Sequence, residues 1–186
     1  WIKEIDINPL FASHEELIAL DARVVLYGPE VKEEELPRLA IRPYPKELEE
    51  TLSPSDDKEL LLRPVLPEDE PSLQALVSRA SPEDLRLRFF QPIRELSHQM
   101  AAALTQIDYH REMALVAVGP GLPGKAEIYG IVNLSADPNG ERAEYSIIVD
   151  RAMMRLGLGN LLMRRIIDYA RRRGIGEIYG EVLQEN

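Results

Sequence analysis

The sequence predicts a mixed α/β fold, with a mostly antiparallel sheet and helices on both of its faces. From residue 59 the pattern gives a strand, two or three helices, three strands in hairpins, a helix and a strand. The helices are grouped and do not alternate one for one with the strands, so a regular doubly wound parallel sheet is excluded. The turn sequence DPNG at residues 137–140 is typical of an antiparallel hairpin.

Composition limits the classes of function. The formal net charge of −10, from 22 basic and 32 acidic residues, disfavours binding to nucleic acid or to an anionic membrane surface. No apolar run approaches the ~20 residues that a membrane span needs. The chain has no cysteine, which excludes disulfides and thiolate chemistry and fits a cytoplasmic protein. Because it opens at Trp1 without a start Met or a signal peptide, we expect an internal or trimmed piece of a longer chain.

The N-terminal 58 residues are expected to form two parts. Residues 1–27 resemble two strands with a turn at Asn8-Pro9, a piece too short to fold alone. Residues 28–58 are rich in proline and acidic side chains, a composition typical of a linker, with room for a short helix near residues 34–39.

A compact unit is expected from residue 59 to 186. Its first half predicts a strand over 60–65, a helix from Pro67 to about Arg79, a second helix from Ser81 and a third over 98–107. Ser81 is suited to cap its helix, with proline at the first helical position and Asp84 closing a capping box.

The second half of this unit predicts strands over 113–118, 128–134 and 144–149, then a helix and a last strand over 178–183. The helix carries an apolar stripe of Leu158, Leu161, Leu162, Ile166, Tyr169 and Ala170. It is expected to end at the arginines 171–173 and a cap at Gly174.

The most informative motif is the turn MRLGLGN (residues 154–160), which follows the strand EYSIIV (144–149). Unpaired backbone N–H groups at such a helix start bind phosphate, helped by the positive end of the helix dipole. The alternative is that the glycines only allow close packing of helix on strand. Since Glu144 is the one carboxylate in the strand, the combination points to an enzyme that handles a diphosphate cofactor.

The segment RLGLG (155–159) with its flanks resembles the acyl-CoA-binding motif of the GNAT N-acetyltransferase superfamily, usually Gln/Arg-x-x-Gly-x-Gly/Ala. The resemblance covers residues 59–186, with Met154 at the usual Gln/Arg position. It implies acetyl-CoA as cosubstrate, held by Ile147, Ile148, Val149, Met154, Arg155, Leu156, Gly157, Leu158, Gly159, Asn160 and Asn186. GNAT domains continue past the fifth strand, so C-terminal elements are expected to be missing here, and a homo-oligomer in which another chain supplies them stays open.

Further fragments narrow the resemblance: LRLRFF (85–90), DYHREMALVA (108–117) and ADPNGERAE (136–144) resemble bacterial Pat-type protein lysine acetyltransferases. EIDINPL (4–10), LDAR (20–23) and LAIRPYP (39–45) are similar to the tail of the ATP-grasp domain of ADP-forming acyl-CoA synthetases. The implied order is an ATP-grasp tail (1–27), a linker (28–58) and a GNAT domain (59–186). The implied partner is a lysine of an AMP-forming acyl-CoA synthetase. Asn8 and Asp21 resemble ligands of a complete ATP-grasp site, but no metal is expected in this fragment.

Acetylation of lysine needs a base, because the lysine amine has a reference pKa of about 10.4 and is protonated at neutral pH. The resemblance implies Glu144 as this base, with Glu141 as runner-up and a plain solvent-facing charge as the alternative. Backbone N–H groups of residues 147–149 would pair with the pantetheine arm and polarise the thioester carbonyl. Two other functions stay open: a non-catalytic acyl-CoA sensor, and acetylation of small amines such as polyamines, which the acidic surface would suit.

Overall fold

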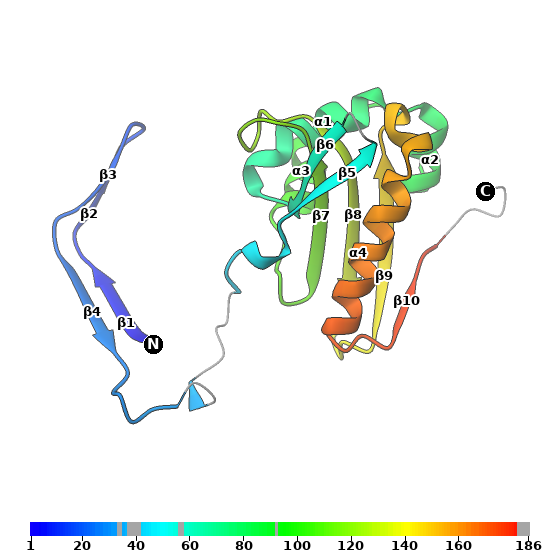
Figure 1. The fold of residues 1–186 in the computed structure, drawn as a ribbon. Helices are drawn as coiled ribbons and strands as arrows, with labels where there is room; N and C mark the ends of the chain where they lie inside the picture. Colours follow the sequence, from blue (N-terminus) through cyan, green and yellow to red (C-terminus); the bar gives the residue numbers. More distant parts are fainter. Residues whose placement is uncertain (33–34, 37–41, 56–57, 92, 182–186) are drawn as a thin grey trace. The chain divides into compact units, whose positions relative to one another are not determined.

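The computed structural model describes residues 1–32, 35–36, 42–55, 58–91 and 93–181. The chain divides into two compact units, Trp1–Ala40 and Ile41–Asn186, called here the N-terminal unit and the main unit (Figure 1). Asn186, most of the helix expected near 34–39 and the end of the last expected strand lie outside the described residues.

The described part of the N-terminal unit contains four short strands, where the sequence predicted two. Strand β1 (Ile2–Ile7) pairs antiparallel with β4 (Ala22–Leu26), and β2 (Leu10–Ala12) with β3 (Leu17–Ala19). The two ladders are joined by backbone hydrogen bonds from Asn8 N to Asp21 O and from Leu20 N to Pro9 O, each 3.2 Å. The prediction was wrong because Pro9, which has no N–H to donate, divides each arm of one long hairpin into two strands.

The main unit contains a six-stranded sheet in the order β10-β9-β8-β7-β6-β5. The strands are β5 (Glu50–Ser55), β6 (Lys58–Pro64), β7 (Glu112–Val118), β8 (Ile128–Ala136), β9 (Arg142–Val149) and β10 (Glu177–Tyr179). Neighbouring strands are antiparallel except β9 and β10, which are parallel. The expected mixed, mostly antiparallel sheet is therefore confirmed.

Strand β5 corrects the expected linker over 28–58. Residues 50–55 pair with β6 and Leu52 is buried in the core, so this part of the chain belongs to the main sheet. The sequence signal was misleading because Pro54 and the acidic residues beside it are uncommon in strands. Within the described residues β5 is the last strand of the sheet, and an edge strand tolerates proline.

Helices cover both faces of the sheet (Figure 1). One face carries α1 (Glu70–Arg79), α2 (Pro82–Phe89) and α3 (His98–Thr105), and the other carries α4 (Leu158–Arg172). Short 3-10 helices lie at η2 (Lys46–Leu48), η3 (Pro67–Asp69) and η4 (Arg151–Leu156). Helix α4 packs closely on the sheet at Gly130, where an added Cβ would lie 2.9 Å from a methyl group of Leu162. These layers hold β9 between helices on its two sides.

Two local signals are confirmed by the structure. The Ser81 hydroxyl accepts a hydrogen bond from Asp84 N (3.1 Å), and the Asp84 carboxylate accepts from Ser81 N (3.3 Å), which is a capping box. Gly174 follows α4 with a positive φ of 75°, as expected of a glycine cap. The apolar stripe of α4 is also confirmed, with Leu158, Leu162, Ile166 and Ala170 buried.

Candidate active site

Strands β9 and β10 lie side by side over only a short distance. Their pairing ends at Glu144 and Tyr179, and beyond this point the edge of β9 that faces away from β8 has no strand partner within the described residues. The Tyr145 ring lies against Gly180, where an added Cβ would meet it at 2.8 Å. Backbone N–H and C=O groups on one edge of residues 145–149 are therefore left without a strand partner.

A cavity of about 260 Å³, called here the strand-edge cavity, runs along this part of β9. Its walls are residues 144–149 of β9, Asp84 and residues at the end of α2, Met154 of η4, and Gly180 and Glu181 after β10. Ile147 and Val149 pack on the α4 side of the sheet, and Ile148 is buried on the other. Because these three side chains pack in the core, a ligand in the cavity would contact the backbone of this strand and not these side chains.

The turn into α4 lies after β9. Asp150 caps η4 by accepting a hydrogen bond from Ala152 N (2.9 Å), and the Arg79 guanidinium of α1 donates to the same carboxylate (2.8 Å). Gly157 has a positive φ of 78°, and an added Cβ there would have no heavy atom within 4 Å. The first α-helical hydrogen bond runs from Leu161 N to Gly157 O (3.1 Å).

Backbone N–H groups of residues 158–160 precede that bond and have no partner inside the helix. They lie at the positive end of a 15-residue helix, the arrangement that binds phosphate. An added Cβ at Gly159 would meet only Val149, at an ordinary 3.7 Å. Close packing of α4 on the sheet thus requires glycine at 130 and not at 157 or 159, which weakens the packing interpretation of the motif.

A second cavity of about 210 Å³, the α3 cavity, adjoins this site on the face that carries α1–α3. It shares four wall residues with the strand-edge cavity: Arg88, Glu144, Tyr145 and Ser146. Its other walls are aliphatic side chains at the end of α3 and a polar group on the sheet, formed by Glu112, Asn133 and Ser135. Glu144 therefore lies where the two cavities meet.

The sheet register explains the polar group. Ser135 of β8 lies opposite both Glu112 of β7 and Glu144 of β9. One pair further along, the Asn133 side-chain amide donates to the Ser146 hydroxyl across β8 and β9 (3.5 Å). Two carboxylates are thus held on one face of the sheet, beside small hydroxyl and amide groups.

Arg88 of α2 lies over Glu144, at the junction. Burial lowers the pKa of the Arg88 guanidinium, and the negative charge of Glu144 partly offsets this effect. The guanidinium carbon stacks over the Phe89 ring at 4.9 Å. In the described part of the chain Arg88 has no hydrogen bond or ion pair, so its five N–H donors are available to a ligand in either cavity.

The structure brings part of the expected site together. Glu144, Ile147, Ile148, Val149 and Met154 all line the strand-edge cavity. Met154, 51% exposed, occupies this wall where the motif usually has a polar side chain. Arg155, Leu156, Gly157, Leu158, Gly159 and Asn160 lie at the turn outside that lining, and Leu158 offers only its backbone because its side chain is fully buried.

Sequence reasoning missed Arg88, Glu112, Asn133 and Ser146. A signal existed for the pair of Asn133 and Ser146, because counting outward from the DPNG turn gives the register of β8 and β9. For Arg88 the sequence holds no such signal, since only the packing of α2 on β9 places it at the junction.

Two negative findings concern the described residues only. They contain no group of three or more His, Asp or Glu side chains that could hold a metal ion. Nor do they include a helix long and apolar enough to cross a membrane.

Comparison with known proteins gives consistent results. Residues 82–186 match the model of the acetyltransferase (GNAT) family. An acetyltransferase of Pseudomonas aeruginosa is 32% identical over 124 residues, which are 67% of this chain and 66% of that protein. The chain thus spans slightly less than two thirds of the length of this curated relative.

Solved structures show the same fold. The GNAT domain of S. lividans PAT has a TM-score of 0.68 and 26% identity, covering 77% of this chain and 84% of that one. A GNAT-family acetyltransferase from Streptococcus pneumoniae has a TM-score of 0.53 and 26% identity, covering 68% and 77%. Spermidine N-acetyltransferase from Vibrio cholerae, solved with CoA and spermine, has a TM-score of 0.53 at 22% identity, covering 68% and 73%, a likeness of fold alone.

Proposed function

The chain belongs to the acetyltransferase (GNAT) family, whose cosubstrate is acetyl-CoA, and from this premise we propose that it acetylates the Nε amine of a lysine in a protein. The proposed substrate is an AMP-forming acyl-CoA synthetase. Transfer is direct, from acetyl-CoA to lysine, with Glu144 as the general base. The observation that carries the proposal is the position of Glu144 in the walls of both the strand-edge cavity and the α3 cavity.

Acetyl-CoA fits the residues at the turn and along β9. The backbone N–H groups of residues 157–160 would hold the diphosphate, and the open space beside Gly157 leaves room for it. The free edge of residues 147–149 would pair with the pantetheine arm, as a strand would. One of these N–H groups would polarise the thioester carbonyl.

The α3 cavity suits the acceptor lysine. Its aliphatic wall, formed by Ala103, Leu104 and Ile107, matches the four-carbon stem of a lysine side chain. Glu112 and Glu144 match the ammonium group at the end of the stem. A lysine entering here would bring its nitrogen to the junction, beside the end of the strand-edge cavity.

The reaction then balances as follows. Glu144 takes one proton from the lysine ammonium, directly or through one water, and the neutral amine attacks the carbonyl carbon of the thioester. The new C–N bond forms as the C–S bond breaks, and the departing CoA sulfur receives the second proton of the amine. The products are acetyl-lysine, CoA and one proton released from Glu144 to water.

The finer assignment to the Pat type is also part of the proposal. It is supported by the likeness to the GNAT domain of S. lividans PAT and by the sequence fragments similar to the tail of an ATP-grasp domain. We propose residues 1–27 as that tail, followed by a linker from residue 28. Because β5 belongs to the sheet and the main unit begins at Ile41, we propose that this linker ends before Ile41 and that the acetyltransferase domain begins there rather than at residue 59.

A polyamine is the second candidate acceptor. The two carboxylates of the α3 cavity would also attract a small polycation, and the fold is shared with a spermidine acetyltransferase. Competition separates the candidates: an AMP-forming acyl-CoA synthetase and spermidine are offered together with acetyl-CoA, and mass spectrometry follows both products. Acetyl-lysine on the synthetase is the expected main product. Exclusive formation of acetylspermidine would replace the protein substrate, and CoA binding without either product would favour the sensor function.

A further inference from the structure

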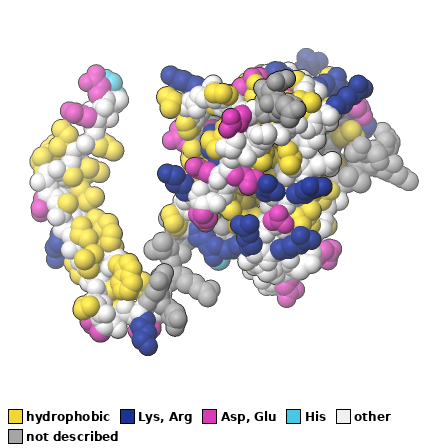
Figure 2. All heavy atoms as spheres, viewed as in Figure 1, with side chains coloured by type: hydrophobic (Ala, Val, Ile, Leu, Met, Phe, Trp, Pro, Cys, Tyr) yellow, Lys and Arg dark blue, Asp and Glu magenta, His cyan; other side chains and the backbone are white. Residues whose placement is uncertain are grey.

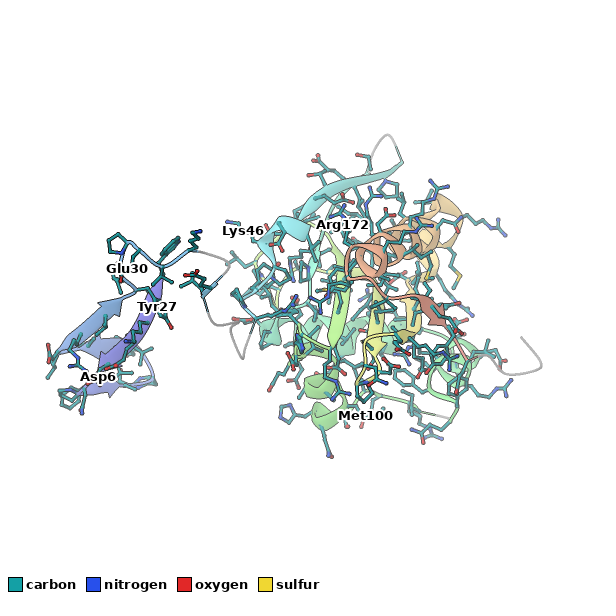
Figure 3. All side chains as sticks on the ribbon, turned by 90° about the horizontal axis from the view of Figure 1, so that it is seen from below. Asp6, Tyr27, Glu30, Lys46, Met100 and Arg172 are labelled. Carbon is teal, nitrogen blue, oxygen red and sulfur yellow. The ribbon has the colours of Figure 1, made fainter. Side chains whose placement is uncertain are left out.

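A third cavity lies on the other face of the sheet from Glu144 and shares only Met113 of β7 with the α3 cavity. It has a volume of about 390 Å³ and lies between η2, the segment before it and the C-terminal end of α4. We call it the tyrosine–arginine cavity, because its walls include Tyr44, Tyr109, Tyr169, Arg42, Arg172 and Arg173. Figure 3 shows Arg172 at the end of α4 beside the segment that carries Lys46.

Hydrogen bonds hold the hydroxyl groups of two of the three tyrosines, and the hydroxyl of the third has no hydrogen bond within the described residues. Tyr44 and Tyr109 meet edge to face at 6.2 Å, and their hydroxyls donate to Glu49 (2.9 Å) and to the Val65 carbonyl (2.8 Å). In the described part of the chain the Tyr169 hydroxyl has no hydrogen-bond partner. Burial raises the pKa of Tyr169, so this hydroxyl keeps its proton and is a donor.

The charge of the cavity is positive, in a chain whose net charge is −10. Arg42 and Arg172 have no hydrogen bond or ion pair within the described residues, while Arg173 donates to the His110 carbonyl (2.9 Å). Glu47 is the one carboxylate among the wall residues. Figure 2 shows Lys and Arg side chains gathered around this end of α4.

Rings and charge together select the ligand. An aromatic cage alone would suit a cation, but this cavity has three arginines and only one carboxylate in its walls, so it would repel a cation. Guanidinium groups bind carboxylate and phosphate through paired hydrogen bonds, and tyrosine faces bind planar rings. The volume lies within the range of about 300–1,000 Å³ typical of small-molecule sites. We propose that the tyrosine–arginine cavity binds a small molecule in which a planar ring carries a carboxylate or a phosphate, a function separate from acetyl transfer.

Four probes test the proposal on the full chain by calorimetry, with the acetyl-CoA site saturated by CoA. AMP and benzoate each combine a ring with an anion, adenosine supplies a ring alone, and inorganic phosphate an anion alone. We expect AMP or benzoate to bind at least about tenfold more tightly than adenosine and phosphate do. AMP binding without benzoate binding assigns a nucleotide-like ligand, and the reverse assigns an aromatic acid. Failure of both to bind, or binding that occurs only when CoA is omitted, overturns the proposal.

Matched variants locate the bound probe. Arg172→Gln should weaken binding about tenfold, and Tyr169→Phe, which removes only a hydroxyl, should weaken it less. Arg171→Gln changes the same charge on the same helix, but Arg171 bonds to Asp168 (3.4 Å) and does not line the cavity. Binding should therefore survive in this control, with the melting temperatures of all three variants compared to that of the unaltered chain. Equal loss in Arg171→Gln and Arg172→Gln would show a general effect of charge and refute a site at the cavity.

Discussion

At the scale of single residues, Glu144 has a place that no other described carboxylate shares, because it lines both cavities of the candidate active site. Its side chain is exposed and projects from the sheet face that carries α2 and α3. We expect Glu144→Gln to lower kcat of acetyl transfer by about 100-fold or more, since the amide cannot accept the proton of the ammonium. Release of CoA thiol measures the rate, and calorimetry should show nearly unchanged affinity for acetyl-CoA.

Glu141→Gln is the matched control for that prediction. Glu141 is also an exposed glutamate near the start of β9, but it lies in the turn before the strand and lines neither cavity. Its replacement should leave kcat unchanged. Loss of activity in Glu141→Gln with full activity in Glu144→Gln would reverse the assignment of the base.

Arg88 is expected to set which amines are accepted. Its guanidinium lies beside Glu144 at the junction, so an acceptor with a second ammonium near its reacting nitrogen would meet like charge. We expect Arg88→Gln to raise kcat/KM for spermidine relative to a lysine peptide, by about tenfold or more, because the local repulsion is removed. Parallel assays of both acceptors measure the ratio. An unchanged ratio would limit Arg88 to a structural role.

The site was predictable from sequence as far as its parts lie in one segment. Glu144 and the glycine turn are 13 positions apart in the chain, and the strand and helix between them have clear local signals. Glu112, Asn133 and Arg88 come from three other elements. They reach the α3 cavity through strand register and helix packing, which depend on side-chain fit across the whole sheet and leave no local pattern.

At the scale of elements, α4 has a glycine of the same backbone geometry at each of its two ends. Gly157 and Gly174 have positive φ values of 78° and 75°, and an added Cβ would have no neighbour within 4 Å at either. Alanine should therefore cost each end a similar free energy of unfolding, about 1 kcal/mol, from backbone strain alone. Only Gly157→Ala should also weaken acetyl-CoA binding, as a methyl group would project into the proposed diphosphate site. Calorimetry and denaturant unfolding of the two variants test both statements.

Gly159→Ala separates contact with the ligand from backbone strain. Gly159 lies in the first turn of α4, and its added methyl would meet only Val149, at 3.7 Å. The variant should be as stable as the unaltered chain or slightly more so, because alanine favours helix. Weaker acetyl-CoA binding in this stable variant would support a diphosphate held by the backbone N–H groups at the start of α4. If Gly157→Ala and Gly159→Ala both bound acetyl-CoA as tightly as the unaltered chain, the diphosphate would have to lie elsewhere.

The start of α2 depends on a carboxylate that also reaches η4. Burial acts to raise the pKa of Asp84, but hydrogen bonds from Ser81 and Arg151 outweigh it and hold this pKa below the ordinary 3.8. The ionised form therefore stabilises the fold above that value, and the stabilisation is lost as the pH falls through the lower folded-state pKa. We expect Asp84→Asn to cost about 1 kcal/mol at pH 7.

The pH dependence is the sharper part of this prediction. The difference in melting temperature between Asp84→Asn and the unaltered chain should be full at pH 7 and should shrink on acidification below 3.8. Glu83→Gln is the control: Arg86 also lowers the pKa of the neighbouring Glu83, but this ion pair lies on the exposed surface of the helix, where it contributes little stability, so the control should show a much smaller change with pH. A difference that stays constant down to low pH would mean that the charge of Asp84 does not contribute.

Features that depend on residues close in the sequence were predictable, and features that depend on pairing with distant segments were not. The capping box of α2 and the glycine cap of α4 depend on side chains within a few residues, and both are present. Strand β5 forms because β6 offers it a partner, although its own composition is poor for a strand. The break at Pro9 was visible, but its consequence depends on residues 20–21 across the hairpin.

At the scale of the whole molecule, the two units differ in how much apolar surface they bury. Both core clusters of the main unit consist of residues from 52 onward. In the N-terminal unit most of the large apolar side chains are exposed, Leu17 by 70%, and Figure 2 shows them over much of its visible surface. Burial of apolar surface is the main source of stability, so the main unit has a core of its own, whereas the N-terminal unit has little buried apolar surface.

We therefore expect a chain of residues 42–186 to melt within about 2 °C of the full chain, since removing unburied side chains changes the free energy of unfolding by less than about 1 kcal/mol. Binding of the dye ANS should fall in the shorter chain, because the dye reports exposed apolar surface. Differential scanning calorimetry and ANS fluorescence measure the two effects on matched samples. A fall in melting temperature above about 5 °C would mean that the main unit's own core does not account for its stability. Unchanged ANS binding would place the exposed apolar surface on the main unit instead.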